Sequence, residues 1–78
     1  MSLTIYSTEW CGPCRRLKDQ LSREGVHFDV VDIETTAGAE DIVKEINDGF
    51  ATVPTLVFHD GTTMTNPMLG EVMAKLAC

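Results

Sequence analysis

Two apolar segments near the start of the chain differ in their period. Residues 3–7, LTIYS, are rich in β-forming side chains and alternate in polarity, which is typical of a strand with one buried face. Further along, Cys14, Leu17 and Leu21 recur at helical spacing and form one apolar stripe. Gly25 follows, in the position where helices often end. The pattern predicts a strand and then a helix.

The middle of the chain repeats this order. Residues 26–33, VHFDVVDI, predict a second strand that is largely buried. Residues 35–49, TTAGAEDIVKEINDG, predict a loop followed by a helix. We expect Ile42, Val43 and Ile46 to form the inner face of that helix.

The last third of the chain predicts a hairpin. The segments 54–58, PTLVF, and 62–65, TTMT, flank the dipeptide Asp60-Gly61. Asp-Gly between two apolar runs is a strong signal for a two-residue turn. We therefore expect two antiparallel strands here.

The chain ends in a predicted third helix. Asn66 resembles an N-cap and Pro67 suits the first helical position. The positions expected to line the inner side of this helix are Leu69, Val72, Met73 and Leu76. The complete order is β-α-β-α-β-β-α, an α/β fold with a mixed four-stranded sheet and three helices.

Composition and charge narrow the classes of function. The chain has 78 residues, 44% of them hydrophobic, so one small globular domain over residues 1–78 is expected, acting as a monomer. A net charge of −6 argues against a nucleic-acid partner. No targeting signal and no membrane span are recognisable, so a cytoplasmic location is expected, where thiols stay reduced.

The pair Cys11 and Cys14 carries the candidate chemistry. Structural zinc needs about four ligands, and the other candidates, His27, His59 and Cys78, are scattered without paired spacing. We expect no metal held within one chain and no tightly bound cofactor, and we interpret Cys78 as an exposed bystander thiol. A cluster shared between two chains stays open as an alternative.

A redox pair fits the position of these cysteines better. Cys11 falls near the N-cap of the first helix, with Gly12, Pro13 and Cys14 in its first turn. Unpaired N–H groups and the helix dipole favour a thiolate there. Arg15 is expected to lower the pKa of the Cys11 thiol further.

The two sulfurs are expected to differ. Cys14 shares the apolar stripe with Leu17 and Leu21, so it is predicted to point inward and remain a thiol. Cys11 is predicted to be exposed. This assigns nucleophilic attack on a disulfide to Cys11 and resolution of the mixed disulfide to Cys14.

A second motif, Thr52-Val53-Pro54, precedes the third strand. Proline cannot donate to a sheet ladder, so it belongs at a strand start or edge. Alongside the cysteine motif we expect a cis bond before Pro54, which would bring Val53 beside Cys11. Free backbone groups of Val53 could then pair with an extended substrate.

With these motifs the sequence resembles the thioredoxin-fold redoxins, specifically the compact glutaredoxin group. WCGPC, TVPT and the closing hairpin and helix carry the likeness over nearly the whole chain. Within the group it most resembles the mycoredoxins of actinobacteria, through LTIYSTEWCGPCRRLK, VDIE and TVPTLVFHDGTTMTNP.

The resemblance implies an enzyme that reduces mixed disulfides between proteins and mycothiol, with mycothiol, or alternatively glutathione, as co-substrate. Cys11 would be the nucleophile and Cys14 the second cysteine. A further set would line the thiol groove or flank it: Trp10, Gly12, Pro13, Arg15, Thr52, Val53 and Pro54. Thr65 and Asn66, expected at the start of the last helix, would contact the polar end of the small thiol, although capping alone also explains Asn66.

Departures from the family pattern keep alternatives open. The dipeptide Gly12-Pro13 is that of thioredoxins, whereas mycoredoxins more often have an aromatic residue at the position of Pro13. The chain could therefore be a dithiol protein-disulfide reductase or a ribonucleotide reductase electron donor. A buried aspartate typical of thioredoxins is replaced by Ile5. An iron–sulfur or zinc binding module is a third possibility.

Overall fold

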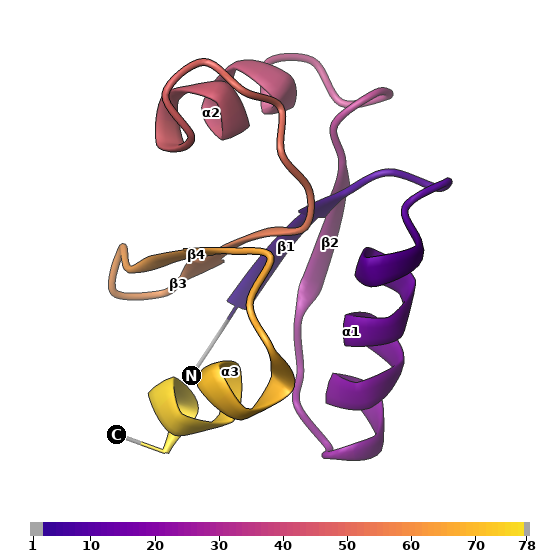
Figure 1. Ribbon diagram of the computed structural model, residues 1–78, viewed down its shortest axis with the longest axis vertical. Coiled ribbons are helices and arrows are strands. Elements are labelled where there is room, and N and C mark those ends of the chain that lie inside the picture. The colour runs from indigo at the N-terminus through magenta and orange to yellow at the C-terminus, as the bar shows by residue number, and fades with distance from the viewer. Residues whose placement is uncertain (1–2, 78) are drawn as a thin grey trace.

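The computed structural model describes residues 3–77 and confirms the predicted order of elements (Figure 1). The elements are β1 (Leu3–Ser7), α1 (Gly12–Arg23), β2 (Asp29–Asp32), α2 (Ala39–Ile46), β3 (Thr55–Phe58), β4 (Thr63–Thr65) and α3 (Leu69–Leu76). Cys78 lies outside the described residues, so its predicted exposure stays a prediction.

The four strands form one mixed sheet in the order β2-β1-β3-β4. β1 pairs with β2 in parallel, with Ile5 opposite Val30. β3 pairs antiparallel with β1, and β4 pairs antiparallel with β3. The crossover and the closing hairpin therefore have the predicted directions.

The strict alternation of β1 separates two apolar clusters on opposite faces of the sheet. Leu3 and Ile5 are buried in the larger cluster with residues of α1 and α3. Tyr6 packs against the smaller cluster, which contains Ala39 and Val43 of α2. Figure 1 shows α2 set apart from α1 and α3. The cysteine-bearing helix thus rests on the larger core.

Helix α1 follows the sequence prediction closely. Cys14, Leu17 and Leu21 are all buried. Gly25 has a φ of +74° just after the helix, in the left-handed region that glycine adopts without a steric penalty. The apolar stripe therefore fixes which side of α1 faces the sheet.

The prediction of a largely buried second strand was wrong. β2 covers residues 29–32, and Asp29 and Val30 are exposed. β2 is an edge strand, so it has a sheet neighbour on one side and less cover than a central strand. The run of valines indicated a strand and gave no information about its place in the sheet.

The inner face of α2 also differs from the prediction at one position. Ile42 is exposed, with a relative accessibility of 44%. Ala39 and Val43 are buried and Ile46 is half-buried. These three residues lie on one face at spacings of four and three, whereas Ile42 points away from it.

The hairpin turn is one residue longer than predicted. The Gly61 amide donates to the Phe58 carbonyl at 2.9 Å, and the Phe58 amide donates to the Thr62 carbonyl at 2.8 Å. Three residues therefore connect the paired ends, and Gly61 has a φ of +88°. This is the three-residue loop with glycine in the left-handed position.

The third helix starts later than predicted. Its N-cap is Met68, whose amide donates to the Glu71 carboxylate at 2.9 Å. Asn66 is not the cap: its φ of +47° is left-handed and its amide donates to the Pro54 carbonyl at 2.8 Å. Asn66 therefore ties the end of β4 to the proline loop.

Candidate active site

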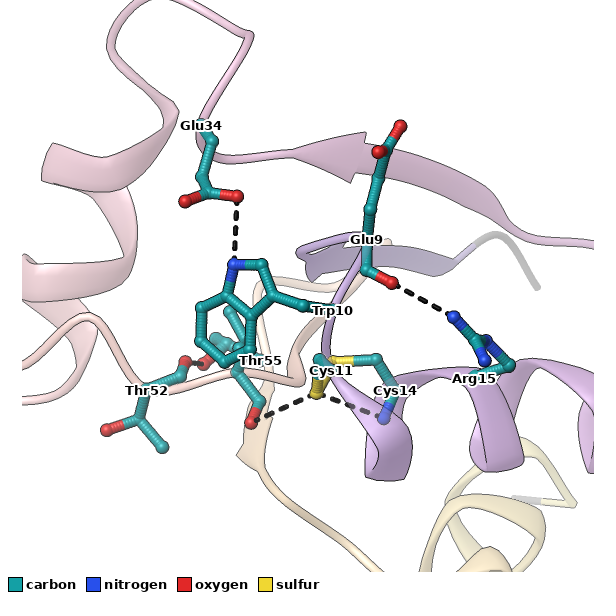
Figure 2. The surroundings of a disulfide bond; sticks show 9 residues. Glu9, Trp10, Cys11, Cys14, Arg15, Glu34, Thr52 and Thr55 are labelled. Atoms are coloured by element: carbon teal, nitrogen blue, oxygen red, sulfur yellow. Dashed lines mark hydrogen bonds between the residues drawn. A yellow bond between two sulfur atoms is a disulfide. The ribbon is translucent and has the colours of Figure 1, made fainter.

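Two loops meet at one end of the sheet, where β1 ends and β3 begins. Cys11 is the N-cap of α1, and its Sγ accepts a hydrogen bond from the Cys14 amide at 3.2 Å. Cys11 and Cys14 form a disulfide (Figure 2). A cysteine at the N-cap places its sulfur against the free N–H groups of the first turn, which stabilise negative charge.

Cys11 is far less exposed than predicted. Its relative accessibility is 5%, against 0% for Cys14. The bond to Cys14 holds the Cys11 sulfur over the first helical turn, and the backbone of Val53 covers another side. The predicted order of accessibility holds, but the prediction of an exposed Cys11 was wrong for this disulfide form.

The proline loop, residues 52–54, faces the disulfide. The Val53–Pro54 bond is cis, as predicted. The Val53 carbonyl oxygen lies 3.9 Å from Cys11 Sγ. A disulfide sulfur carries no proton, so this approach is a van der Waals contact and not a hydrogen bond. It brings the two sequence motifs together.

Trp10 lies beside the disulfide and is 72% exposed. Its Nε1 donates to Glu34 Oε1 at 3.0 Å, from the loop that follows β2 (Figure 2). The Glu34 amide in turn donates to Asp32 Oδ1 at 2.8 Å. The indole is therefore oriented by a carboxylate that sequence analysis did not identify.

Arg15 does not make the contact predicted from its spacing. Its Nη2 donates to the Glu9 carbonyl at 3.1 Å, so the guanidinium is directed to the loop that precedes Cys11. Figure 2 shows this side chain reaching back along the outside of the turn. Arg15 therefore ties helix α1 to its own entry loop.

The proline loop is held by side chains from three other segments. Thr55 Oγ1 donates to the Thr52 carbonyl at 2.7 Å and accepts from Asn47 Nδ2 at 3.0 Å. Thr65 Oγ1 donates to Asn47 Oδ1 at 2.6 Å. Thr65 thus directs its hydroxyl proton to Asn47, and neither Thr65 nor Asn66 lies at a helix start.

A groove of about 340 Å³ opens beside the cysteine pair, between α1 and the segment that leads into α3. Pro13, which stands between the two cysteines, is one of its lining residues. Arg16 and Gln20 of α1 line one wall, and Asn66 and Met68 line the other. The groove combines one positive charge with amide groups and apolar surface.

Asp60, an acidic residue with a lowered pKa, lies away from the cysteine pair. The Lys75 ammonium, with its Nζ 2.6 Å from Asp60 Oδ2, holds the pKa of that carboxyl well below its usual range. A hydrogen bond from the Thr62 amide adds to this effect. Asp60 belongs to the β3–β4 turn, at the opposite end of β3 from Pro54.

Residues 3–77 contain neither a cluster of metal-binding side chains nor a membrane-spanning helix. Within this range, no group of three or more His, Cys, Asp or Glu side chains is arranged to hold a metal ion. No helix in the same range is long and apolar enough to cross a membrane.

Residues that sequence reasoning missed are Asn47, Thr55 and Glu34. Asn47 follows a helical pattern directly, and an asparagine there is a weak signal for a C-terminal cap. Thr55 follows Pro54 in the strand and looks like any β-forming residue. Glu34 follows a strand as an ordinary exposed carboxylate, and nothing in the sequence links it to Trp10.

Comparison with known proteins agrees with this geometry. The family model for glutaredoxin matches residues 3–62. A protein of Mycobacterium tuberculosis named as a glutaredoxin is 51% identical over 75 residues, covering 96% of this chain and 89% of that protein. Mycoredoxin 1 of Corynebacterium glutamicum is 43% identical over 75 residues, covering 96% and 92%.

Solved structures show the same fold. The thioredoxin-like protein BC3987 superimposes with a TM-score of 0.78 at 22% identity, covering 92% of this chain and 96% of that one. A glutaredoxin from Archaeoglobus fulgidus gives 0.75 at 22% identity, covering 97% and 86%. The predicted thioredoxin fold is therefore confirmed.

Proposed function

We propose that this chain, which belongs to the glutaredoxin family of thiol–disulfide oxidoreductases, reduces mixed disulfides between proteins and mycothiol. The observation that carries the proposal is the position of Cys11 at the N-cap of α1, with the Cys14 amide 3.2 Å from its sulfur. A thiolate formed there is stabilised by the helix N-terminus.

The proposed reaction is thiol–disulfide exchange. The Cys11 thiolate attacks the mycothiol sulfur of the mixed disulfide; the protein thiol leaves as a thiolate and takes up a proton. A second mycothiol thiolate then attacks the sulfur of that mycothiol on Cys11, which releases mycothiol disulfide and regenerates the Cys11 thiolate. In sum, one free mycothiol is oxidised, the protein sulfur is reduced to a thiol, and the two mycothiol sulfurs leave as one disulfide.

Cys14 provides a second way to resolve the mixed disulfide between Cys11 and mycothiol. Its thiol, after losing a proton, attacks Cys11 Sγ, which releases mycothiol and leaves the Cys11–Cys14 disulfide. This is the disulfide that the structure contains. Together with the Gly12-Pro13 spacer it supports a second candidate function, the two-thiol reduction of protein disulfides.

The groove next to Pro13 is the site we propose for the small thiol. Its sulfur would lie at Cys11, and the backbone of Val53 would pair with its peptide-like part. Arg16 and Asn66 line the groove and can donate hydrogen bonds to sugar hydroxyls. Trp10, Gly12 and Thr52 would border the substrate at the loop surfaces.

The remaining features of the proposal follow from this reaction. The reacting atoms come from one chain, so we propose that residues 1–78 act as a single domain and as a monomer. The co-substrate is a diffusible thiol, with no tightly bound cofactor or metal. A reducing cytoplasm is the compartment that would keep the Cys11 thiol available.

A direct test offers one peptide as two mixed disulfides, one with mycothiol and one with glutathione, each with its own thiol as reductant. We expect kcat/KM to be higher for mycothiol by at least about tenfold, since specificity is the ratio of these values. Equal values, or a preference for glutathione, would overturn the choice of thiol but leave the exchange chemistry intact.

A further inference from the structure

Asn47 ends α2 and forms hydrogen bonds to three different segments. Its Nδ2 donates to the Val43 carbonyl at 2.9 Å and to Thr55 Oγ1 at 3.0 Å. Its Oδ1 accepts from Thr65 Oγ1 at 2.6 Å. Both N–H groups of the amide are therefore used, and one residue connects α2, β3 and β4.

The chemistry of these groups fixes the direction of each bond. The Val43 carbonyl can only accept, so it must face Nδ2 and not Oδ1. Thr55 Oγ1 has a single proton, and it accepts from Asn47, so that proton is free for the Thr52 carbonyl at 2.7 Å. The amide of Asn47 thus sets the orientation of the Thr55 hydroxyl.

The three carbonyls of the proline loop have different partners. The Thr52 carbonyl accepts from the Thr55 hydroxyl, and the Pro54 carbonyl accepts from the Asn66 amide at 2.8 Å. The Val53 carbonyl lies 3.9 Å from Cys11 Sγ. The carbonyls on either side accept hydrogen bonds from other groups of the protein, and the middle one faces the reacting atom.

We propose that Asn47 is a positioning residue for thiol–disulfide exchange, which acts through Thr55 and Thr65 to hold the Val53 backbone against Cys11. The inference rests on the exchange reaction of the family and not on the identity of the small thiol. It predicts that loss of the Asn47 amide weakens substrate binding while Cys11 itself remains intact.

Asn47→Asp is the sharpest substitution because it keeps the shape of the side chain and removes its donors. The Thr55 hydroxyl can then turn its proton to the new carboxylate, which leaves the Thr52 carbonyl without that donor. Thr55→Val removes the same link from the other side. Glu45→Ala, an exposed position on the same helix, is the matched control.

Kinetics are measured with the peptide–mycothiol and peptide–glutathione mixed disulfides. We expect Asn47→Asp and Thr55→Val each to raise KM by about tenfold, at the upper end of what one hydrogen bond contributes. We expect kcat to stay within about twofold of the parent, since the Cys11 thiolate is held by α1. The double variant should be no worse than the poorer single variant, because both break one chain of contacts.

A second control separates positioning from stability. Leu3→Ala removes buried apolar surface from the larger core cluster, which does not include Val53, and leaves the Asn47 side-chain amide in place, so it lowers Tm by another route. If Leu3→Ala raises KM as much as Asn47→Asp at an equal loss of Tm, Asn47 has a merely structural role and the proposal is wrong.

Amide hydrogen exchange provides a measurement that needs no activity. In Asn47→Asp we expect the Asn66 amide, which donates to Pro54, to exchange about tenfold faster, while the Leu56 amide of the central strands is unchanged. Equal exchange at Asn66 in both proteins would overturn the proposal. A parent chain inactive on both mixed disulfides would overturn the proposed function, and hydrogen exchange would still decide the role of Asn47.

Discussion

The cysteine loop, residues 8–14, and the proline loop, residues 52–54, face each other but are held in different ways. Cys11 caps its own helix, and its closest polar contact is the amide three residues later. The proline loop is held by Thr55, the next residue along the chain, and by Asn47 and Asn66, which come from the ends of α2 and β4. Apart from the Trp10 indole, which Glu34 holds, the cysteine loop is ordered by local contacts, whereas the proline loop also depends on contacts with distant segments.

This difference matches what each loop has to do. The cysteine loop makes and breaks a covalent bond in every cycle, so its order should not depend on that bond. Helix capping gives it such a constraint, since the N–H groups of the first turn remain in both states. The proline loop undergoes no covalent change and can be held permanently by hydrogen bonds.

The largest effect is expected from Cys11→Ser. Serine is among the best N-cap residues, so α1 should keep its start and its stability. A serine hydroxyl at neutral pH is a far weaker nucleophile than a thiolate, so turnover should fall to the uncatalysed rate. Peptide release from the mixed disulfide measures this, and Tm is compared with that of the reduced parent.

Cys11→Ser therefore tests whether the N-cap, and not the reactive sulfur, orders the cysteine loop. A Tm equal to that of the reduced parent together with no turnover is the expected result. A large loss of Tm would show that the sulfur itself, and not the cap, orders the loop, and the contrast with the proline loop would fail.

The next largest effect is expected from Cys14→Ser, and it depends on the substrate. Mixed disulfides need one thiol, so kcat/KM for them should change by less than about tenfold, or about 1.4 kcal/mol of barrier. Protein disulfides need the second thiol, so their reduction should stop at a covalent complex with Cys11. Mass spectrometry of the trapped species measures this.

Cys14→Ala is the matched control, because a serine hydroxyl would be buried at a position of 0% exposure. Both variants should behave alike if the missing thiol is what matters. Loss of activity on mixed disulfides in both variants would favour the two-thiol candidate function over the mycothiol proposal.

The order of elements was predictable from the sequence because local pattern determines it. The stripe of Cys14, Leu17 and Leu21 indicated both the first helix and its buried side, and all three residues are buried. Edge position was not predictable: Val30 looks like a core residue, yet β2 has a neighbour on one side only. Which strand lies at an edge depends on topology, which alternation along one strand does not encode.

The same distinction between local and long-range features applies to the residues of the site. The cysteine motif and its place at a helix start were predictable because each is a local feature, and the cis bond before Pro54 was predictable because both motifs occur in one chain. The hydrogen bonds of Asn47 and Glu34 join residues up to 24 positions apart, so no short motif indicates them. The prediction for Arg15 failed because spacing on a helix gives a side chain's reach but not its partner, here the Glu9 carbonyl.

A smaller effect is expected from Glu34, which holds Trp10 in place. Trp10 is the single tryptophan of the chain, so its fluorescence reports on this contact directly. Glu34→Ala should free the indole and raise KM for the mixed disulfide by about twofold to tenfold, the range of one hydrogen bond. Fluorescence anisotropy and KM are measured on the same samples.

Glu34→Gln distinguishes the hydrogen bond from the charge. Glutamine keeps an acceptor oxygen for the indole N–H, so anisotropy should remain that of the parent. If KM changes in Glu34→Gln while the indole stays ordered, the negative charge beside the cysteine loop, and not the position of Trp10, affects the substrate.

The smallest effect is expected at the far end of the sheet, from Asp60→Asn, and it concerns stability alone. The Lys75 ammonium holds the pKa of Asp60 below its usual range in the folded protein, so the unfolded chain binds the proton more tightly. The contribution of Asp60 is therefore complete above its ordinary pKa and is lost as the pH falls through the lower folded value. Asp60→Asn should lower Tm slightly at pH 7, and the difference should shrink below about pH 4.

The response to salt shows whether Asp60 and Lys75 are held by charge attraction or by a directional hydrogen bond. Asp60 is exposed, so its attraction to Lys75 should weaken as ionic strength rises, and the difference in Tm should shrink with it. Asn47 acts through neutral hydrogen bonds, so the KM effect of Thr55→Val should persist in the same salt series. A Tm difference at Asp60 that resists salt would show that a directional hydrogen bond, as in the proline loop, and not charge alone holds this end of α3.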